Sequence, residues 1–476
     1  MKILKHIILG AAAMTAMTAA AQAAPRSAYF LDGYTFRHEL NPAFAGERNY
    51  VSIPALGNMD VALFSTVGVN SFLYPTAPGS TYKLTTFMSP TVSADEFLKH
   101  IGNNNHINAN VDLTILSAGF KAWQGFNTIT IGVRSEVGVN VPGDLFRFMK
   151  LAQTSNDTHY NLKNLRVSAN AMAEIAFGHS RKVMDKLQAG AKFKVLLGLG
   201  NATAHIKNMD LRLSDQVWSV TADGTLEMAA GSGLYVPTRR EAGKDFDNAM
   251  EANRIEWGDI NYDNFGLSGF GLGIDLGATY QLLPDLQLSA ALNDLGFMSW
   301  NHAVKGHTGT EWKFDGFKDV TVTESQPNHE DNKIDEQFDN IWNGLEDLIY
   351  FQREETDGSY AKALRATLHL GAEYKMPFYQ KLTGGFLFTQ YFAGVSSWTE
   401  GRFYATVKPI KWFDATINYG ASTYGSSFGW MINFHPKGFN FFLGSDHQFF
   451  KVTPQYVPVG NATASINLGF NVTFGS

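Results

Sequence analysis

The sequence predicts an all-β membrane protein, a closed antiparallel outer-membrane β-barrel of about 14 strands. Residues 464–474 give the clearest signal, because Ile466, Leu468, Phe470, Val472 and Phe474 alternate with polar or small residues and form one apolar face. The same alternation recurs along most of the chain in segments of about ten residues, the length at which a tilted strand crosses a bilayer. The connections between segments are alternately short and mostly long, as in barrels with short periplasmic turns and longer extracellular loops.

The first residues predict a secretory signal peptide. Lys2 and Lys5 precede an apolar run over 7–21, and Ala21-Gln22-Ala23 is a small-x-small cleavage site, so we expect residues 1–23 to be removed. A transmembrane anchor is the alternative, but the run is rich in alanine and interrupted by threonine. No later apolar stretch reaches 18 residues, so a closed barrel is the expected way to span a membrane. The predicted location is the outer membrane of a Gram-negative bacterium.

Composition and motifs exclude several functional classes. The formal net charge of −6 does not suit a nucleic-acid-binding protein, and the absence of cysteine excludes disulfides, cysteine-ligated metals and thiol nucleophiles. Asp259-x-Asn261-x-Asp263 opens like a calcium loop, but Asn264 replaces the required glycine. The Gly-x-Ser-x-Gly match at 425–429 is expected in a hairpin turn. We therefore expect no enzymatic activity, no cofactor and no metal site.

The alternation also gives the order of elements. Residues 24–58 show no clean pattern and are predicted to form a lumenal plug, whereas residues 59–476 form the barrel. Long loops are expected at 68–108, 141–163, 199–267 and 298–361, and short helices after Ser93, which begins a capping box, and over 144–150. Because the short connections lie on the periplasmic side, both termini should be periplasmic. The predicted strands are residues 59–67, 109–120, 127–140, 164–178, 186–198, 268–282, 286–297, 362–375, 382–392, 399–408, 412–421, 427–434, 439–450 and 463–474.

Charged and aromatic residues support a barrel. A charge that faces lipid at the midplane would cost roughly 2–4 kcal/mol, and ten charged residues in the third to sixth and the eighth predicted strands lie opposite the apolar register. A soluble sandwich would segregate charge in the same way, but aromatic residues at the short turns favour a membrane interface. The charged residues are Arg134, Glu136, Arg166, Glu174, Lys192, Lys194, Asp275, Arg365, Glu373 and Lys375, and the aromatic residues are Trp123, Phe126, Phe378, Tyr379, Trp412, Phe413, Phe434 and Phe439.

Polar residues on the inner register are the candidate functional residues. Arg365, His369 and Glu373 follow one another at steps of four along one strand, so all three face the lumen. Two interpretations remain open: these residues line a permeation path or ligand site, or they pair with one another and with the plug. The other candidate lumen-lining residues are Arg134, Glu136, Arg166 and Glu174.

A second candidate is the acidic insertion over 319–357. Within it Ile334, Phe338, Ile341, Leu345 and Leu348 recur at steps of three and four, which predicts an amphipathic helix. This helix is either an extracellular lid or docking surface, or a solvated loop helix packed on neighbouring loops.

Specific motifs resemble known outer-membrane families. Asn41-Pro42-Ala43, close to the mature N-terminus, resembles the FadL-like long-chain fatty-acid transporter superfamily, in which a lumenal hatch carries this motif. The resemblance implies a plug anchored by Asn41, Pro42 and Ala43. The stretches at 29–43 and 92–98 are similar to an uncharacterised family of Bacteroidota outer-membrane proteins that contain a domain of unknown function.

The resemblance implies that a hydrophobic or amphipathic small molecule passes through a plugged barrel embedded in outer-membrane lipid. The alternative is a surface scaffold or secretion-associated barrel, as in a related branch of the superfamily, whose acidic extracellular loops bind a partner protein.

Overall fold

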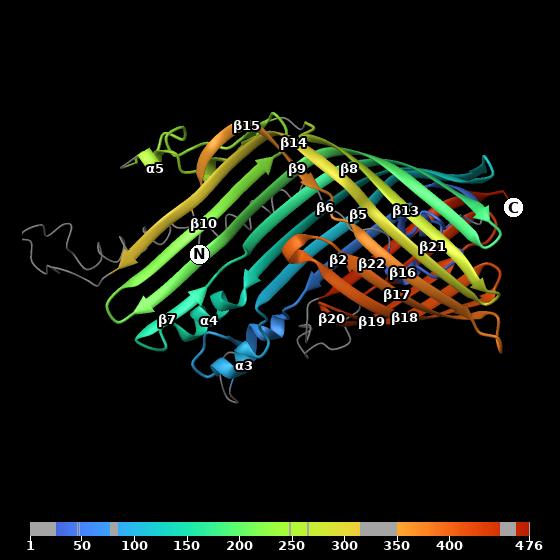
Figure 1. The fold of residues 1–476 in the computed structure, drawn as a ribbon, viewed down its shortest axis with the longest axis horizontal. Helices are drawn as coiled ribbons and strands as arrows, with labels where there is room; N and C mark the ends of the chain where they lie inside the picture. The colour runs from blue at the N-terminus through green and yellow to red at the C-terminus, as the bar shows by residue number, and fades with distance from the viewer. Residues whose placement is uncertain are drawn as a thin grey trace, which may run out of the picture.

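The computed structural model describes residues 25–44, 46, 48–76, 84–246, 249–263, 266–314, 350–447 and 463–475. The strands run obliquely between two ends of an elongated molecule (Figure 1). The tight hairpins gather near the C-terminus at one end, and helices α3, α4 and α5 lie toward the other. Within the described residues, no helix is both long enough and apolar enough to cross a membrane.

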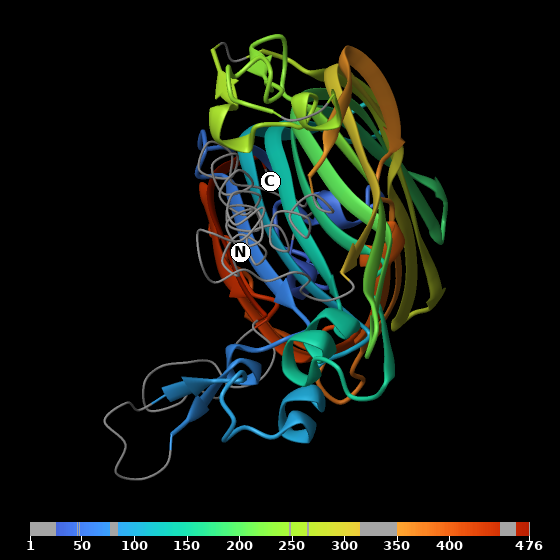
Figure 2. The ribbon, with the colours of Figure 1, turned by 90° about the vertical axis from the view of Figure 1, so that its left-hand side faces the viewer.

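One antiparallel sheet closes on itself to form a barrel. The last strand, β22, pairs with both β1 and β2, as the Val51–Val472 and Met59–Leu468 partners show. β1 and β2 in turn both pair with β5, so they share one position in the wall. The wall therefore has fourteen strand positions, and it surrounds the interior when viewed along the barrel (Figure 2).

The wall is built by β1 (Asn49–Ser52), β2 (Asn58–Ser65), β5 (Asn104–Ala122), β6 (Gly125–Pro142), β8 (Leu165–Met184), β9 (Leu187–Ser214), β13 (Gly269–Leu283), β14 (Leu286–Phe314), β16 (Thr367–Lys375), β17 (Leu382–Tyr391), β18 (Trp398–Ile410), β19 (Phe413–Ser422), β20 (Gly425–Phe434), β21 (Phe439–Ser445) and β22 (Ala464–Phe474). Three further strands, β7 (Asp157–Asn161), β10 (Trp218–Ala229) and β15 (Gln352–Ala363), extend the same sheet.

The connections contain the short elements. These are η1 (Arg26–Ala28), α2 (Arg37–Leu40), η2 (Val69–Ser71), β3 (Leu73–Pro75), β4 (Leu84–Thr86), α3 (Ala94–Leu98), α4 (Gly143–Leu151), β11 (Leu234–Tyr235), α5 (Ala249–Ala252), η3 (Trp257–Asp259), β12 (Asn261–Tyr262) and η4 (Gly394–Ser396). Ser93 caps α3 as its capping box predicts, since the Ser93 hydroxyl accepts a hydrogen bond from the backbone N–H of Glu96.

Neighbouring side chains on one strand face opposite environments. On β18, Phe403 is 67% exposed while Arg402 is fully buried, and on β19, Ile417 is 55% exposed while Asn418 is buried. Apolar side chains thus cover the outside of the sheet and polar ones line its inside, which is the arrangement of a barrel in lipid. The exposed apolar set also includes Phe177, Phe193, Ile274, Leu288, Leu370, Phe386 and Phe470.

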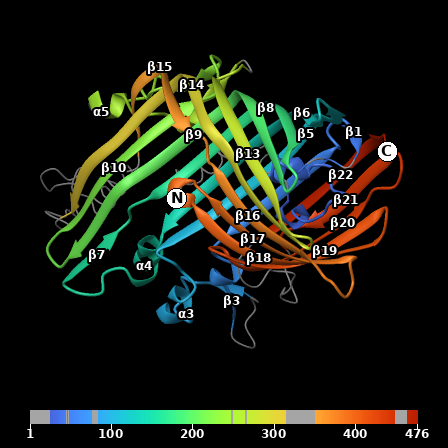
Figure 3. The same ribbon diagram turned by 45° about the vertical axis from the view of Figure 1, so that its right-hand side comes forward.

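The predicted strand order is confirmed, and short turns join the strands at the six expected places: 121–126, 179–185, 283–285, 376–381, 409–411 and 435–438. Two strands, however, are much longer than predicted. β9 and β14 contain 28 and 29 residues and continue into the regions predicted to be long loops at 199–267 and 298–361. β10 fills the gap between their upper halves, because it pairs with both of them. β15 also lies in the second of these regions, and together these strands raise one side of the wall above the other (Figure 3).

The outward face of the raised wall is covered by protein. The alternation of β10 places Leu226 and Met228 on the face opposite Glu227, away from the lumen, yet both apolar side chains are buried. Ile255 from the 230–268 insertion and Phe351 pack against them in one cluster. The sequence of β10 does alternate, with Val220, Ala222, Leu226 and Met228 separated by polar or small residues, so the expectation of a long loop over 199–267 was wrong although the period of two is present.

Three other predictions change in the structure. Residues 49–52, expected in the plug segment, form wall strand β1. Phe126, expected among the interfacial aromatics, is 3% exposed and packs inside the barrel, whereas Trp123 beside it is 75% exposed. The strand expected over 439–450 ends at Ser445, and residues 448–462 lie outside the described residues. The predicted helical stripe at 334–348 lies outside the described residues.

Residues 25–44 lie inside the barrel. Tyr29 donates to or accepts from Ser289 on β14 at 3.0 Å, whereas Tyr404 on β18 donates to the Arg26 carbonyl at 2.9 Å. Ser27 donates to the Ser445 carbonyl at the end of β21 at 3.1 Å. Only a segment within the lumen can reach strands so widely spaced around a closed wall. Its apolar side chains form one buried cluster with the wall: Ala28, Tyr29, Phe30, Leu31, Tyr34, Phe36, Leu40 and Phe44, with Tyr50, Phe126, Leu387, Tyr404, Met431 and Phe442.

Candidate functional site

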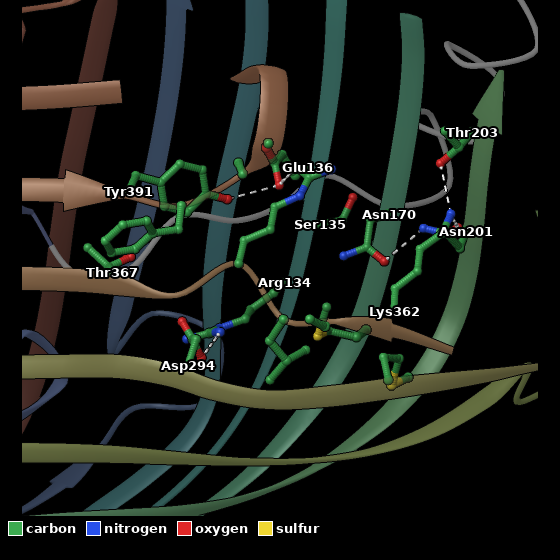
Figure 4. A pocket seen from close by; sticks show the side chains of 18 of the residues that line it. Arg134, Ser135, Glu136, Asn170, Asn201, Thr203, Asp294, Lys362, Thr367 and Tyr391 are labelled. Atoms are coloured by element: carbon green, nitrogen blue, oxygen red, sulfur yellow. Dashed lines mark hydrogen bonds and ion pairs between the residues drawn. The ribbon is translucent and has the colours of Figure 1, made fainter. Parts of the chain in front are cut away.

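A cavity of about 440 Å³ occupies the lumen beside the N-terminal segment. Side chains from several strands point into it (Figure 4). Arg134 and Glu136 come from β6, Asn170 from β8, Asn201 from β9 and Asp294 from β14. The lining also contains apolar side chains, the larger of which are Met172, Met298, Trp300, Leu364 and Phe392.

A bulge in β14 shapes the bottom of the cavity. The pairing of β13 with β14 shifts between Ile274 and Leu276, so that Asn293 and Asp294 together oppose one residue of β13. Asp294 has a positive φ of 59°, a conformation that asparagine and aspartate tolerate better than most residues. Because a bulge resets the alternation, both side chains can point inward, where both are buried or nearly so.

The bulge connects the cavity to the N-terminal segment. Asn293 donates to the carbonyls of Glu39 and Leu40, at 3.2 and 3.1 Å. Asp294, next along the chain, lines the cavity. Two consecutive residues of β14 therefore face different partners: Asn293 contacts the lumenal segment, and Asp294 faces the cavity.

The floor of the cavity is a buried ion cluster. Asp294 accepts from Arg134 at 2.8 Å and from the Lys194 ammonium at 2.7 Å. Lys194 also pairs with Asp275 at 2.8 Å, and Arg134 pairs with Glu174 at 3.1 Å. Two cations thus hold three carboxylates in the lumen, and each carboxylate has a cationic partner, as buried charge requires.

Two further ion pairs form the side walls. Arg365 pairs with Glu136, which also accepts a hydrogen bond from the Tyr391 hydroxyl at 3.3 Å. The Lys362 ammonium pairs with Glu227 at 2.8 Å and donates to Asn201 at 3.1 Å and to Thr203 at 3.2 Å. These side chains are fixed by their partners, so the cavity is preformed.

The space below the floor is small. Three described voids around the N-terminal segment measure about 30, 20 and 10 Å³, and one of them is lined by Glu39, Asp112 and Lys192. A void of this size holds about one water molecule. The N-terminal segment therefore fills the lumen beneath the cavity.

Asn41, Pro42 and Ala43 sit against two wall glycines. The Asn41 amide donates to the Ala290 carbonyl at 3.2 Å, and the Ala43 carbonyl accepts from Gln188 at 2.6 Å. A Cβ at Gly190 would lie 2.1 Å from the Pro42 carbonyl oxygen, and a Cβ at Gly277 would lie 2.0 Å from the Asn41 side-chain oxygen. Only glycine allows so close an approach between wall and lumenal segment.

Charged contacts hold the segment at two more places. Arg26 pairs with Glu400 at 3.1 Å, and Glu400 also pairs with Arg402 at 2.8 Å. Arg37 pairs with Asp32 of its own segment and lies 3.8 Å from Glu373 of β16. Both wall carboxylates are buried.

The structure divides the sequence-predicted lumen residues into two groups. Arg134, Glu136, Arg166 and Arg365 line the cavity, and Glu174 belongs to its floor. His369 and Glu373 instead contact or approach the N-terminal segment: the His369 ring lies 5.8 Å from the Tyr29 ring and bonds Thr389 at 3.0 Å.

Sequence reasoning missed Asp294, Asn201, Thr203, Lys362 and Tyr391. Asp294 could have been found, because Asn293-Asp294 interrupts an otherwise apolar or small alternation and so indicates a bulge. Asn201, Thr203 and Lys362 lie at or beyond the predicted ends of their strands and lacked a register. In the described part of the chain, no cluster of three histidine or acidic side chains could hold a metal ion.

The fold and the cavity define a membrane-type β-barrel whose lumen is filled beneath a charged cavity. The chain belongs to the family of unknown function DUF5723, whose sequence profile matches residues 42–446. This match confirms the predicted resemblance to a family with a domain of unknown function. A search of curated proteins finds no match.

The solved structures to which the chain is similar include two toluene transporters and a FadL homologue. The toluene transporter TbuX of Ralstonia pickettii has a TM-score of 0.44 and 11% identity, covering 93% of this chain and 95% of that chain. The toluene transporter TodX of P. putida has a TM-score of 0.39 and 11% identity, covering 92% of each chain. A Pseudomonas aeruginosa FadL homologue has a TM-score of 0.38 and 10% identity, covering 96% of this chain and 99% of that chain. Similarities at this level do not assign a function to this chain.

The Gly190 contact gives a first prediction. Gly190→Ala places a methyl group against the Pro42 carbonyl, so residues 25–46 should be displaced and trypsin should cut after Arg26 or Arg37 in the folded barrel. Gly200→Ala on the same strand is the control, because the nearest atom to its Cβ lies 3.8 Å away. Mass spectrometry of the digests gives the readout, and equal resistance of both variants would contradict the close contact.

The ion cluster gives a second prediction. Lys194→Met removes the ammonium that Asp275 and Asp294 share, and stability should fall by about 3–5 kcal/mol because buried carboxylates lose their partner. Urea unfolding in lipid vesicles, followed by tryptophan fluorescence, measures the change. Lys182→Met, at an exposed position on β8, should have little effect, and equal stability of the two variants would show that the cluster is not needed.

Proposed function

We propose that this chain is an outer-membrane barrel that passes a hydrophobic or amphipathic small molecule across the outer membrane. The observation that carries the proposal is the cavity of about 440 Å³, which is preformed, partly apolar and located in the lumen. Ligand sites of small molecules are typically concave, partly apolar and about this size. The exposed apolar belt supports a position in lipid, and the short hairpins beside the C-terminus support periplasmic termini.

In this proposal the N-terminal segment acts as a plug and Asn41-Pro42-Ala43 as its anchor. The ligand enters the cavity above the ion cluster, and the plug prevents free diffusion of water and ions below it. Passage then requires a local movement of the segment or of the wall beside it. The Asn293–Asp294 bulge is the proposed link, since it contacts the Leu40 carbonyl and lines the cavity at once.

Two features make a local movement more plausible than ejection of the plug. The segment buries a continuous aromatic and aliphatic cluster against the wall, and it carries Arg26 and Arg37 into contacts with wall carboxylates. Removing all of these contacts together would cost far more than shifting the short stretch around Leu40 and Asn41.

Deletion of residues 25–46 tests the proposal and preserves strand β1. The deleted chain should form stable ion-conducting channels in planar bilayers, because the space now filled by the segment becomes water, whereas the full chain should conduct little. Heat-modifiable migration on gels checks that the barrel assembles. A folded deletion variant that does not conduct would contradict the plug.

The transport step needs its own measurement. Cells that produce the full chain should take up 2-naphthol across the outer membrane faster than cells that lack it. If the barrel is present in the membrane but these cells take up 2-naphthol no faster than cells without the chain, passage of compounds of this kind is rejected. A role as a scaffold is then favoured.

A further inference from the structure

Arg166 is the unusual charge of the cavity. It lies on β8 with its side chain lining the cavity, and its cross-strand neighbours are Asn140 and His205. Among the described residues, no carboxylate lies within ion-pair distance of its guanidinium, and no hydrogen bond holds it. A guanidinium kept in a partly buried cavity without a hydrogen-bond acceptor loses solvation that more distant charges only partly replace.

The nearby carboxylates are already used. Glu136 and Glu227 attract Arg166 electrostatically, but Glu136 pairs with Arg365 and Glu227 pairs with Lys362. Arg365 itself repels Arg166. Asp294, the remaining acidic residue of the lining, accepts from two cations of the floor. Each of these carboxylates is therefore in direct contact with another cation, and among the described residues the Arg166 guanidinium is left without a paired carboxylate.

The surroundings of Arg166 fit one ligand geometry. A guanidinium offers a planar fork of N–H donors that matches a carboxylate or sulfonate, and such charge-assisted bonds are strong in a cavity that excludes much of the water. The same cavity is also lined by Met172, Met298 and Trp300, which suit an apolar body. The volume of about 440 Å³ limits that body to a compact one.

We propose that Arg166 is the anion-binding residue of the cavity and that the ligand is a compact organic monoanion, with its carboxylate or sulfonate on Arg166 and its apolar body against Met172, Met298 and Trp300. This inference deepens the proposed function, since it names the class of molecule that would pass. A single anionic group is expected because, in the described part of the lining, one guanidinium has no paired carboxylate. Neutral and cationic compounds with the same apolar body bind less well, the cationic one because it meets Arg166 and Lys362.

Three matched probes test the proposal on the full chain in lipid nanodiscs. They are 2-naphthoate, 2-naphthylmethanol and 2-naphthylmethylammonium, which share an apolar body and differ in charge. Isothermal titration should show 2-naphthoate binding at least about tenfold more tightly than the alcohol, with the ammonium compound weakest, as expected for a charge-assisted hydrogen bond. The proposal would be overturned if 2-naphthoate bound no more tightly than 2-naphthylmethanol. It would also be overturned if none of the three compounds bound.

Variants assign the effect to Arg166. Arg166→Gln should lower the affinity for 2-naphthoate about tenfold and leave that for the alcohol unchanged. Arg166→Lys should retain part of the preference, since it keeps the charge and loses the fork. Arg181→Gln, at an exposed position on the same strand, is the matched control and should behave as the native chain. Unchanged 2-naphthoate affinity in Arg166→Gln would overturn the assignment.

The binding and transport results are separable. If 2-naphthoate binds through Arg166 but the chain does not increase its uptake by cells, the anion site stands and the proposed passage fails. If uptake increases for 2-naphthol and 2-naphthoate alike and Arg166→Gln changes neither affinity, passage stands and the anion site fails.

Discussion

A backbone in lipid has no water to satisfy its N–H and C=O groups, so each strand must bond to a neighbour on both sides. In this chain the requirement is met when β22 returns to β1 and β2, which both pair onward to β5. Once the sheet is closed, strand alternation gives every residue one of two environments. Phe403 faces outward and Arg402 inward for this reason alone. The outer apolar belt and the inner polar lumen are two results of the same closure.

A closed wall of fourteen strands leaves a lumen too wide for its own side chains to fill. The N-terminal segment occupies much of that space, and the wall is adapted to it in detail. Gly190 and Gly277 allow the backbone around Pro42 to approach, while Glu400 and Glu373 face Arg26 and Arg37. Above the segment the filling stops, and the cavity begins at the cluster around Asp294. The cavity therefore exists because the filling segment ends below it.

The barrel could be predicted from sequence because its signal is repeated and local. Each membrane-facing strand carries the period of two, and the charges fall on one register, so errors at single residues do not change the result. The raised wall carries the same period of two, since Val220, Ala222, Leu226 and Met228 alternate with polar or small residues. What its sequence does not show is that Ile255 and Phe351 cover this apolar face, because that contact joins distant parts of the chain. Phe126 lies on the register of the buried Thr128 and Thr130, so strand alternation places it inside even though it lies beside a turn.

The candidate site was predicted in part. Arg134, Glu136, Arg166 and Arg365 could be placed in the lumen from their register, and all four line the cavity. Which lumenal charges line the cavity and which meet the N-terminal segment depends on contacts between residues hundreds of positions apart, such as that of Arg37 with Glu373. A one-residue bulge at Asn293–Asp294 also changes the register within a strand, so the residues beyond it are assigned to the wrong face unless the bulge is known.

Lipid surrounds the sheet, while water and the chain itself occupy its inside. The chain contains no cysteine, so a single introduced thiol can carry a fluorophore at a chosen face. In vesicles, a fluorophore attached through Leu370→Cys should be quenched by brominated lipid chains and not by aqueous iodide. One attached through Asn170→Cys, in the cavity, should show the reverse. Quenching of neither fluorophore by brominated lipid, with the fold retained, would contradict the account.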